Sequence, residues 1–305
     1  MKIFFTNSLN GGHRMSYKIV LDVGGTQIKS AVLDENANLV TFNSIPTPNN
    51  ITDFILDEVI QIVEQYKELY HLDPVYVGIS SAGVINRDTG TVVYSSPTIA
   101  NFTGTNYKQA LSHITPFVYV CNDVDAALLG ELHTYQYAQQ QIFCLTLGTG
   151  IGGAFYTSET GLYQGANSRA NEIGYMLYRP DSETTYEQRA ATSALQTQIT
   201  HQYSSTDVDV KSLFLQAKQG DETASALLHT WGKDVAEGVA QIQLLYDPAL
   251  ILIGGGISAQ GDQLLQYIVP YVSYFLPANY EHAPIQTTHA LNNAALLGAG
   301  SLITL

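Results

Sequence analysis

Residues 18–33 read KIVLDVGGTQIKSAVL, an apolar run that reaches two glycines and continues at once into a second apolar run. Residues 142–156 repeat this design as IFCLTLGTGIGGAFY. At an offset of 124 residues (146 minus 22), the coinciding residues are Asp22 with Thr146, Gly24 with Gly148, and Thr26 with Gly150. This internal repeat predicts two related halves, each beginning with a strand, a glycine turn and a second strand.

Strands and helices alternate along the rest of the chain. Apolar runs that predict strands lie at residues 39–44, 75–80, 117–121 and 249–256. Asn50 is a candidate N-cap of a helix. The apolar stripe of this helix is expected to be Ile55, Val59, Ile62, Tyr66 and Leu69. Further helices are predicted at 222–246, from about 259, and at 291–302. The alternation predicts the α/β class.

The two halves run together without a linker-like or low-complexity segment, so we expect two packed lobes. The first lobe is expected at residues 15–121 and the second at 122–290. A C-terminal helix at about 291–305 is a candidate to pack back on the first lobe. Residues 1–14 precede the first convincing strand and are expected to be a flexible extension.

The composition argues against a nucleic-acid-binding, a membrane and a secreted protein. Lysine plus arginine (13) against aspartate plus glutamate (27) gives a net charge of −14, which disfavours nucleic acid as a partner. No apolar run reaches the roughly 20 residues of a membrane helix, and the apolar patch at 3–5 is too short for a secretory signal. Cys121 and Cys144 lie in apolar runs and are expected to be reduced and buried. We therefore expect a cytoplasmic protein.

Glycine turns are the second informative feature. Residues 148–153 (GTGIGG) fit G-x-G-x-x-G, but the next residues predict a strand, whereas a dinucleotide-binding turn opens into a helix. A P-loop is excluded because no Gly-Lys-Ser/Thr occurs. A third glycine turn follows an apolar run at 254–256. Each turn alone is equally explained as a tight hairpin, whereas three together favour phosphate binding by backbone amides.

A carboxylate stands where a strand is predicted to end and a helix to begin. Asn122 and Asp123 follow the run at 117–121 and precede the apolar residues 126–129. An aspartate there is explained either as a helix cap or as a catalytic group. The residues alone leave both explanations open.

Five segments together resemble the ROK family of repressors and sugar kinases. In chain order they are DVGGTQIKSAV, NDVDAALLGE, LTLGTGIGGA, GANSRANEIGYM and LILIGGGIS. The resemblance runs from about Lys18 to the C-terminus. It implies two lobes of the actin-like ATPase type, a duplicated ribonuclease H-like fold, with a sugar and Mg-ATP meeting in the cleft between them. It also implies a homodimer, with ATP and Mg²⁺ as cofactors.

The resemblance also implies roles for single residues. Asp123 would be the general base, and Asp22 would hold Mg²⁺ directly or through water. The sugar would be bound by Asn122, Asp123, Glu172, Glu187 and Asn101. ATP would be bound by Asp22, Gly24, Gly25, Thr26, Lys29, Gly148, Thr149, Gly150, Gly152, Gly254, Gly255 and Gly256. Lys29 is equally explained as a solvated edge residue and Asn101 as an ordinary loop residue, and the letters around Glu187 match only loosely.

One departure from the family bears on the sugar. Many members continue from Glu-Ile-Gly into a histidine and a cysteine-rich zinc loop, but here Tyr175 follows and residues 176–190 contain neither cysteine nor histidine. We therefore expect no zinc site. Tyr175, with Tyr178 and Tyr186, could stack on a second sugar ring. This favours a hexose or β-glucoside, phosphorylated at the 6-hydroxyl of a glucose unit.

The sequence also bears on three alternatives to a kinase of glucose or a β-glucoside. N-acetylmannosamine is a different sugar substrate for the same kinase. A sugar-sensing repressor would carry a helix-turn-helix domain before the first glycine turn, and the 21 residues ahead of Asp22 are too few for one. An inactive sugar-binding relative could have lost Asp22, Asp123 and the glycine turns, all of which are present.

Overall fold

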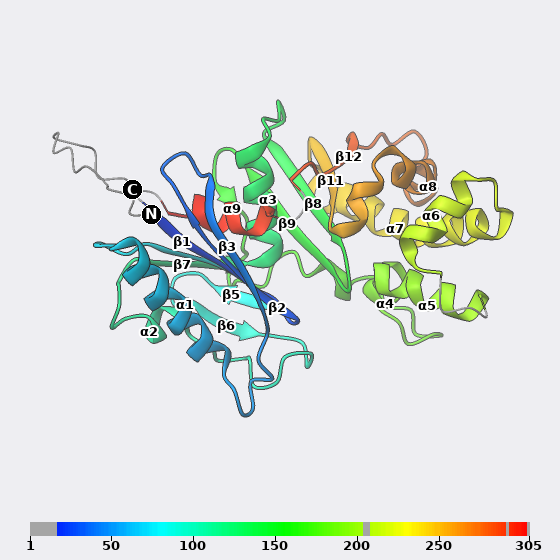
Figure 1. The fold of residues 1–305 in the computed structure, drawn as a ribbon. Helices are drawn as coiled ribbons and strands as arrows, with labels where there is room; N and C mark the ends of the chain where they lie inside the picture. The colour runs from blue at the N-terminus through cyan, green and yellow to red at the C-terminus, as the bar shows by residue number, and fades with distance from the viewer. Residues whose placement is uncertain (1–16, 204–207, 291–292, 304–305) are drawn as a thin grey trace, which may run out of the picture.

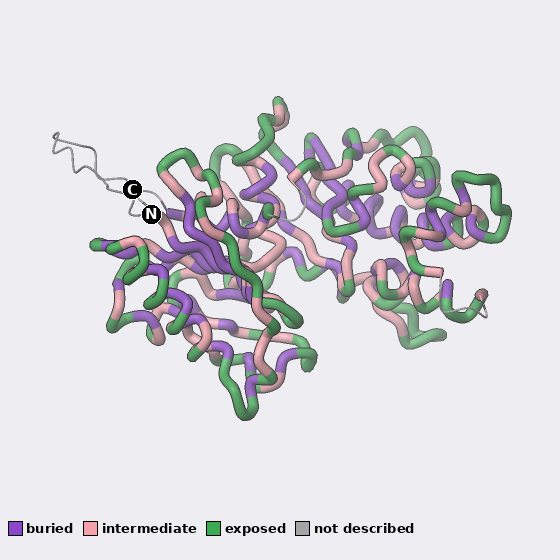
Figure 2. Tube along the Cα trace, in the orientation of Figure 1, coloured by how far each residue is buried: buried purple, intermediate pink, exposed green. Residues whose placement is uncertain are grey.

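The computed structural model describes residues 17–203, 208–290 and 293–303. The predicted extension at 1–14 and the start of the predicted helix at 291–302 lie outside these ranges. Two five-stranded sheets dominate the molecule (Figure 1), and their central strands are mostly buried (Figure 2).

The first sheet has the strand order β3-β2-β1-β4-β7. Its strands are β1 (Lys18–Val23), β2 (Gln27–Leu33), β3 (Leu39–Pro46), β4 (Val77–Ser81) and β7 (Val118–Asn122). β1 pairs antiparallel with β2 and parallel with β4, and β7 pairs parallel with β4. A short hairpin of β5 (Val84–Asn86) and β6 (Thr91–Tyr94) follows β4.

The second sheet repeats this arrangement in the order β10-β9-β8-β11-β12. Its strands are β8 (Gln141–Leu147), β9 (Ile151–Thr157), β10 (Gly161–Leu162), β11 (Leu250–Gly254) and β12 (Ile285–Thr287). β8 pairs antiparallel with β9 and parallel with β11, so it occupies the place that β1 has in the first sheet. The repeat in the sequence thus corresponds to a repeat in the strand order.

Helices cover both faces of the two sheets. They are α1 (Ile55–Tyr70), α2 (Tyr107–Ala110), α3 (Asp123–Thr134), α4 (Tyr186–Ala190), α5 (Thr192–Gln202), α6 (Val210–Lys218), α7 (Glu222–Tyr246), α8 (Asp262–Val272) and α9 (Ala294–Ser301), with 3₁₀ turns η1 (Ile173–Tyr175), η2 (Gly256–Gln260) and η3 (Ser273–Phe275). Within the described ranges, no helix combines the length and the apolar character needed to cross a membrane.

Two helices lie between the sheets. α1 shares one core with the first sheet, and α9 packs on the other face of that sheet through Leu296 and Ala299. α3 packs Leu128 against the second sheet, whose opposite face is covered by α7. α3 and α9 also pack against each other. The order of layers is therefore α1, first sheet, α9 with α3, second sheet, α7.

The first helix departs from its prediction. It begins at Ile55 with Phe54 at the N-cap position, so the prediction of Asn50 as the N-cap was wrong. Asn50 has a left-handed φ of 58° and lies five residues before the helix. Its Oδ1 accepts a hydrogen bond from the Ile55 N–H at 3.2 Å. Leu69 was expected in the buried stripe but is 66% exposed, because the apolar face passes through Tyr66 and the half-buried Tyr70 instead.

Two glycines let α3 and α9 touch backbone to backbone. A Cβ added to Gly130 of α3 would lie 1.9 Å from the Ala294 carbonyl oxygen. A Cβ added to Gly298 of α9 would lie 1.8 Å from the Ala126 carbonyl oxygen. Both distances are far below van der Waals contact, so any side chain would force the two helices apart.

This contact predicts that Gly298→Ala destabilises the protein. Helix propensity alone would make alanine more stable by about 1 kcal/mol. We expect the steric clash to prevail and to lower the free energy of unfolding by about 3 kcal/mol, measured in urea. Gly256→Ala is the control, because a Cβ at Gly256 meets nothing within 4 Å. A Gly298→Ala protein as stable as the wild type would contradict the close packing.

Candidate active site

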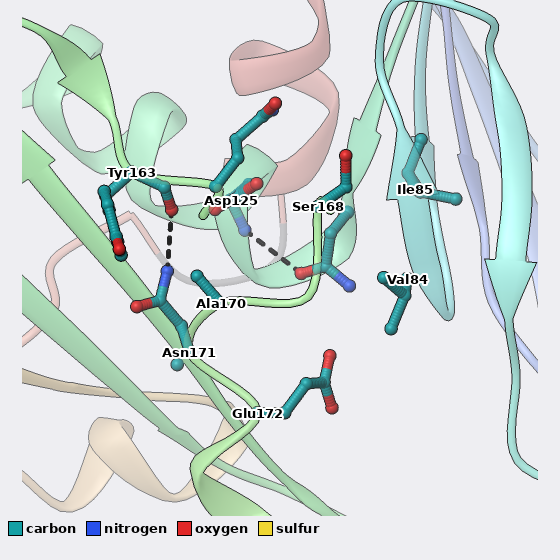
Figure 3. A pocket seen from close by; sticks show the side chains of 11 residues that line it. Val84, Ile85, Asp125, Tyr163, Ser168, Ala170, Asn171 and Glu172 are labelled. Atoms are coloured by element: carbon teal, nitrogen blue, oxygen red, sulfur yellow. Dashed lines mark hydrogen bonds between the residues drawn. The ribbon is translucent and has the colours of Figure 1, made fainter. Parts of the chain in front are cut away.

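Two cavities meet at the start of α3. The large cavity, of about 410 Å³, lies between the sheets and is lined by Asp22, Lys29, Asp123, Val124, Ala127, Cys144, Thr146, Gly254, Gly255, Gly256, Ala259, Thr288, Ala290, Ala294 and Ala295. The small cavity, of about 30 Å³, is lined by Val84, Ile85, Asn122, Asp125, Gly153, Tyr163, Gln164, Ser168, Ala170, Asn171 and Glu172 (Figure 3). The first turn of α3 contributes to both cavities, so it lies at the boundary between them.

Asp22 is held at the end of β1 by residues of the neighbouring strands. In the register of the sheet it lies beside Lys29 of β2 and Ser80 of β4. The Ser80 hydroxyl donates to Asp22 Oδ1 at 2.8 Å, and the Lys29 ammonium lies 3.5 Å from Oδ2. Lys29 thus lines the large cavity and faces a carboxylate. Ser80 had no signal in the sequence, because its contact with Asp22 depends on strands 58 residues apart.

Asp123 is the first residue of α3, but Asn122 caps the helix. Asn122 Oδ1 accepts hydrogen bonds from the backbone N–H groups of Val124 at 2.8 Å and Asp125 at 3.4 Å. Asp123 Oδ1 also accepts from Val124 at 2.9 Å. The cap is therefore satisfied without Asp123, and its carboxylate lines the large cavity.

The surroundings of Asp123 shift its ionisation. Burial raises the pKa of Asp123 most, and the negative charge of Asp22 raises it further, with a smaller contribution from Asp125. The hydrogen bond from Val124 opposes these effects, and the resulting pKa is about 7. A carboxylate with this pKa exchanges its proton near neutral pH, as a general base must.

Asp125 points into the small cavity and is paired. The Arg87 guanidinium, from the turn between β5 and β6, donates to Asp125 Oδ2 at 2.8 Å. Burial raises the pKa of Asp125, and Arg87 opposes this shift. Asn122 beside it donates its amide to the Gly83 carbonyl oxygen at 2.8 Å. With its oxygen used by the cap, Asn122 keeps one N–H hydrogen for a ligand.

Glu172 and Glu187 lie in different surroundings. Glu172 lines the small cavity, where its side chain reaches toward the strand that carries Val84 (Figure 3). Burial raises the pKa of Glu172 most, followed by the negative charges of Glu187 and Asp125. Glu187 does not line either cavity; its Oε2 accepts from the Ile151 N–H at 2.7 Å. Its observed contact therefore supports the second glycine turn.

The segment after Glu172 is folded around Arg189. This side chain donates to the carbonyl oxygens of Leu177 at 2.8 Å and of Thr184 and Thr185 at 2.9 Å. Tyr186 is fully buried and donates its hydroxyl to the Val235 carbonyl oxygen at 2.9 Å. The expectation that Tyr186 could stack on a sugar was therefore wrong, because its ring belongs to the core.

The three glycine turns differ in their position. Gly254, Gly255 and Gly256 line the large cavity. The other predicted ATP-binding residues do not line either cavity: Gly24, Gly25, Thr26, Gly148, Thr149, Gly150 and Gly152. A Cβ at Gly152 would lie 2.4 Å from a methyl group of Val124, so this glycine lets β9 approach the start of α3.

Asn101 lies away from both cavities. It is exposed, has a left-handed φ of 51°, and donates its side-chain amide to the Asn50 carbonyl oxygen at 3.3 Å. This geometry matches the description of a loop residue. The predicted sugar contact of Asn101 stays untested.

Several cavity residues were missed by sequence reasoning. In the large cavity they include Thr146, Thr288, Ala259, Ala290, Ala294 and Ala295, and in the small cavity Gln164, Ser168 and Asn171. Ser168 and Asn171 belong to the quoted segment GANSRANEIGYM, which could have identified them. Within the described ranges, no group of three or more His, Cys, Asp and Glu side chains is arranged to hold a metal ion.

Comparison with known proteins finds relatives over most of the chain. The ROK family model matches residues 18–304. The glucokinase of Streptomyces coelicolor is 28% identical over 94% of this chain and 98% of its own length. The beta-glucoside kinase of Listeria innocua is 27% identical over 91% of this chain and 94% of its own length. The crystal structure of a ROK family glucokinase from Streptomyces griseus, in complex with glucose and AMPPNP, has a TM-score of 0.79 at 26% identity and covers 94% of this chain and 99% of that chain.

The structural similarity extends over both sheets and the helices between them, because nearly the whole of each chain is superposed. It confirms the predicted α/β fold of the actin-like ATPase type. The family match likewise begins at the first residue of β1 and ends beyond α9. The chain belongs to the ROK family.

Proposed function

We propose that this protein is an ATP-dependent sugar kinase that phosphorylates the 6-hydroxyl of a glucose unit, in a free hexose or a β-glucoside. The observation that carries the proposal is the position of Asp123, a carboxylate with a pKa of about 7 at the boundary between a large and a small cavity. The similar glucokinase and beta-glucoside kinase support the choice of a glucose unit.

The large cavity suits Mg-ATP in its volume and its chemistry. Its volume of about 410 Å³ falls within the range of ligand pockets. Small residues (Ala259, Ala290 and Gly256) leave room for an adenosine, while Lys29 supplies a positive charge for phosphate. Asp22 provides the oxygen ligand that Mg²⁺ takes directly or through water. Bound there, Mg²⁺ would neutralise charge on the phosphates.

Proton transfer is assigned to Asp123. The sugar hydroxyl oxygen forms a bond to the γ-phosphorus while the bond from phosphorus to the ADP oxygen breaks. The hydroxyl proton passes to the Asp123 carboxylate, which must therefore be ionised beforehand. Ser80 and Lys29 hold Asp22 in the same cavity, and Mg²⁺ held by Asp22 would favour the ionised form of Asp123.

The small cavity is assigned to the sugar. Glu172 accepts hydrogen bonds from sugar hydroxyls, and Asn122 donates its remaining amide hydrogen. The cavity of about 30 Å³ is far smaller than a hexose and holds roughly one water molecule. The side chains that line this cavity must therefore rearrange to admit a sugar. Buried polar groups of this kind discriminate against analogues that lack a hydroxyl.

The first prediction is that Asp123→Asn lowers the turnover number by a factor of roughly 10² or more, because the amide does not accept the proton. Sugar binding is retained and the melting temperature does not fall, because Asn122 still caps α3. Asp262→Asn is the matched control, since Asp262 is also the first residue of a helix but is exposed and away from both cavities. An Asp123→Asn enzyme that keeps most of its turnover would refute the assignment of the base.

The second prediction concerns pH. The kcat/KM for the sugar should rise with pH along a limb at or below about 7, because only the ionised Asp123 accepts a proton and Mg²⁺ at Asp22 would lower its pKa from the ligand-free value. Asp125→Asn removes one of the negative charges that raise this pKa, so the rising limb should move to lower pH. Asp262→Asn again serves as the control, and its profile should match the wild type. A limb that stays in place in Asp125→Asn would contradict the electrostatic origin of the shift.

The third prediction concerns the substrate. A coupled assay of ADP release over glucose, cellobiose, mannose, fructose and N-acetylmannosamine should give the highest kcat/KM with glucose or cellobiose. A wide preference for N-acetylmannosamine would reject the glucoside assignment while leaving the kinase assignment intact. ATP hydrolysis that no sugar stimulates would reject both.

A further inference from the structure

Two tyrosines from opposite halves of the molecule meet beside the small cavity. Tyr94 is the last residue of β6, and Tyr175 is the last residue of η1. Their hydroxyl oxygens are 3.3 Å apart. Their ring centroids are 6.5 Å apart and the ring planes make an angle of 71°, so the rings form an edge-to-face pair. No role in the site has yet been given to Tyr94.

Neither tyrosine lines the small cavity itself, but each is a neighbour of a residue that does. Tyr94 is the register partner of Val84, which lines that cavity. Tyr175 follows Glu172, another lining residue, by three positions. The hydrogen bond with Tyr94 raises the pKa of the Tyr175 hydroxyl most, burial adds to this, and the negative charges of Glu187 and Glu172 raise it further. The pair thus stands within electrostatic range of Glu172, the glutamate proposed to bind the sugar, and of Glu187.

The two rings keep much of their surface in solvent. Tyr94 is 44% exposed and Tyr175 is 51% exposed. Exposed aromatic surface adds little to folding, whereas next to a cavity it commonly marks a ligand-binding site. The rings contact each other across the two halves, so a ligand that leaves the small cavity between these halves passes beside them.

We propose that Tyr94 and Tyr175 form an aromatic subsite that binds the second ring of a β-glucoside, and so set the preference for disaccharides over free glucose. This inference rests on the proposed function. In a glucose unit the equatorial bond at C1 and the bond to C6 leave the ring in different directions, so with the 6-hydroxyl at Asp123 a β-linked second ring would extend away from that carboxylate. The C–H face of a pyranose ring packs on the face of a tyrosine.

The charges nearby favour a neutral ring as the occupant. Glu172 and Glu187 both act on Tyr175, and Asp125 raises the pKa of Glu172 in turn. These negative charges would repel a phosphorylated or carboxylated sugar at the subsite. The occupant is therefore a neutral pyranose, such as the second glucose of cellobiose.

The alternative role is a latch between the halves, made by the hydrogen bond of the two hydroxyls. Phenylalanine and alanine variants separate the roles, since phenylalanine keeps the ring and removes the hydroxyl. We expect Tyr94→Ala and Tyr175→Ala to lower the ratio of kcat/KM for cellobiose to that for glucose about tenfold each. Tyr94→Phe and Tyr175→Phe should retain that ratio within a factor of about 2.

Tyr280→Ala is the control, because Tyr280 is 40% exposed but lines neither cavity and forms no aromatic pair within the described ranges. Its ratio should equal that of the wild type. The proposal is overturned if the cellobiose-to-glucose ratio of kcat/KM falls as far in the phenylalanine variants as in the alanine variants. It is also overturned if the alanine variants weaken both sugars equally.

Dissociation constants measured by calorimetry separate this inference from the proposed function. If wild-type protein phosphorylates glucose but binds cellobiose no better than glucose, the subsite is rejected while the kinase assignment stands. If no sugar is phosphorylated, the kinase assignment is rejected. Cellobiose binding that weakens about tenfold relative to glucose in the alanine variants would still support the subsite.

Discussion

The backbone contact of α3 with α9 is the constraint on which the rest of the structure depends. α9 lies on the first sheet and α3 on the second, so the two sheets are joined through Gly130 and Gly298. Glu131 of α3 adds a second connection, because its carboxylate accepts the backbone N–H groups of His289 and Ala290. The start of α3, where Asp123 lies, is thereby fixed relative to both walls of the large cavity.

Electrostatics at the start of α3 follow from this placement. Asp22 arrives from the first sheet, and Asp123 and Asp125 come from the first turn of the helix. Arg87 compensates Asp125, while Asp123 has only backbone N–H groups, its own and that of Val124, to oppose the shift and is left with a raised pKa. Asp22, Asp123 and Asp125 thus have different partners. The negative charge of Asp123 is compensated least, and Asp123 is the residue proposed to accept the proton.

The sequence allowed the prediction of those parts that depend on local patterns. Both glycine-turn hairpins, the long helix α7 and the α/β class followed from periodicity and turn chemistry. The β5–β6 hairpin was missed because its strands have three and four residues, too few for a periodic pattern. Asn50, Leu69 and Tyr186 were misjudged, since the tertiary packing of each is invisible in its neighbouring residues.

In the candidate site, too, local sequence motifs predicted some residues, whereas contacts made only in the folded chain were missed. Asp22, Lys29 and Asp123 were found from motifs, and the structure brings them to one cavity. Ser80 was missed because it meets Asp22 only through the fold. The glycine turns were expected to touch the nucleotide, yet only residues 254–256 line the cavity.

The repeated strand order has a consequence for how an elongated ligand lies in the molecule. At equivalent positions the first sheet carries Asp22 beside Ser80, and the second carries Thr146 beside Gly254. Had both sheets kept a carboxylate, the cleft would present two like ends. Because Thr146 stands in the second sheet where the first has Asp22, the two ends of the cleft differ. The end at Asp22 is charged, and the end at Thr146 and Gly254 is uncharged and lined by smaller residues. A molecule that is ionic at one end and uncharged at the other therefore has one favoured direction, set by the difference between Asp22 in the first sheet and Thr146 in the second.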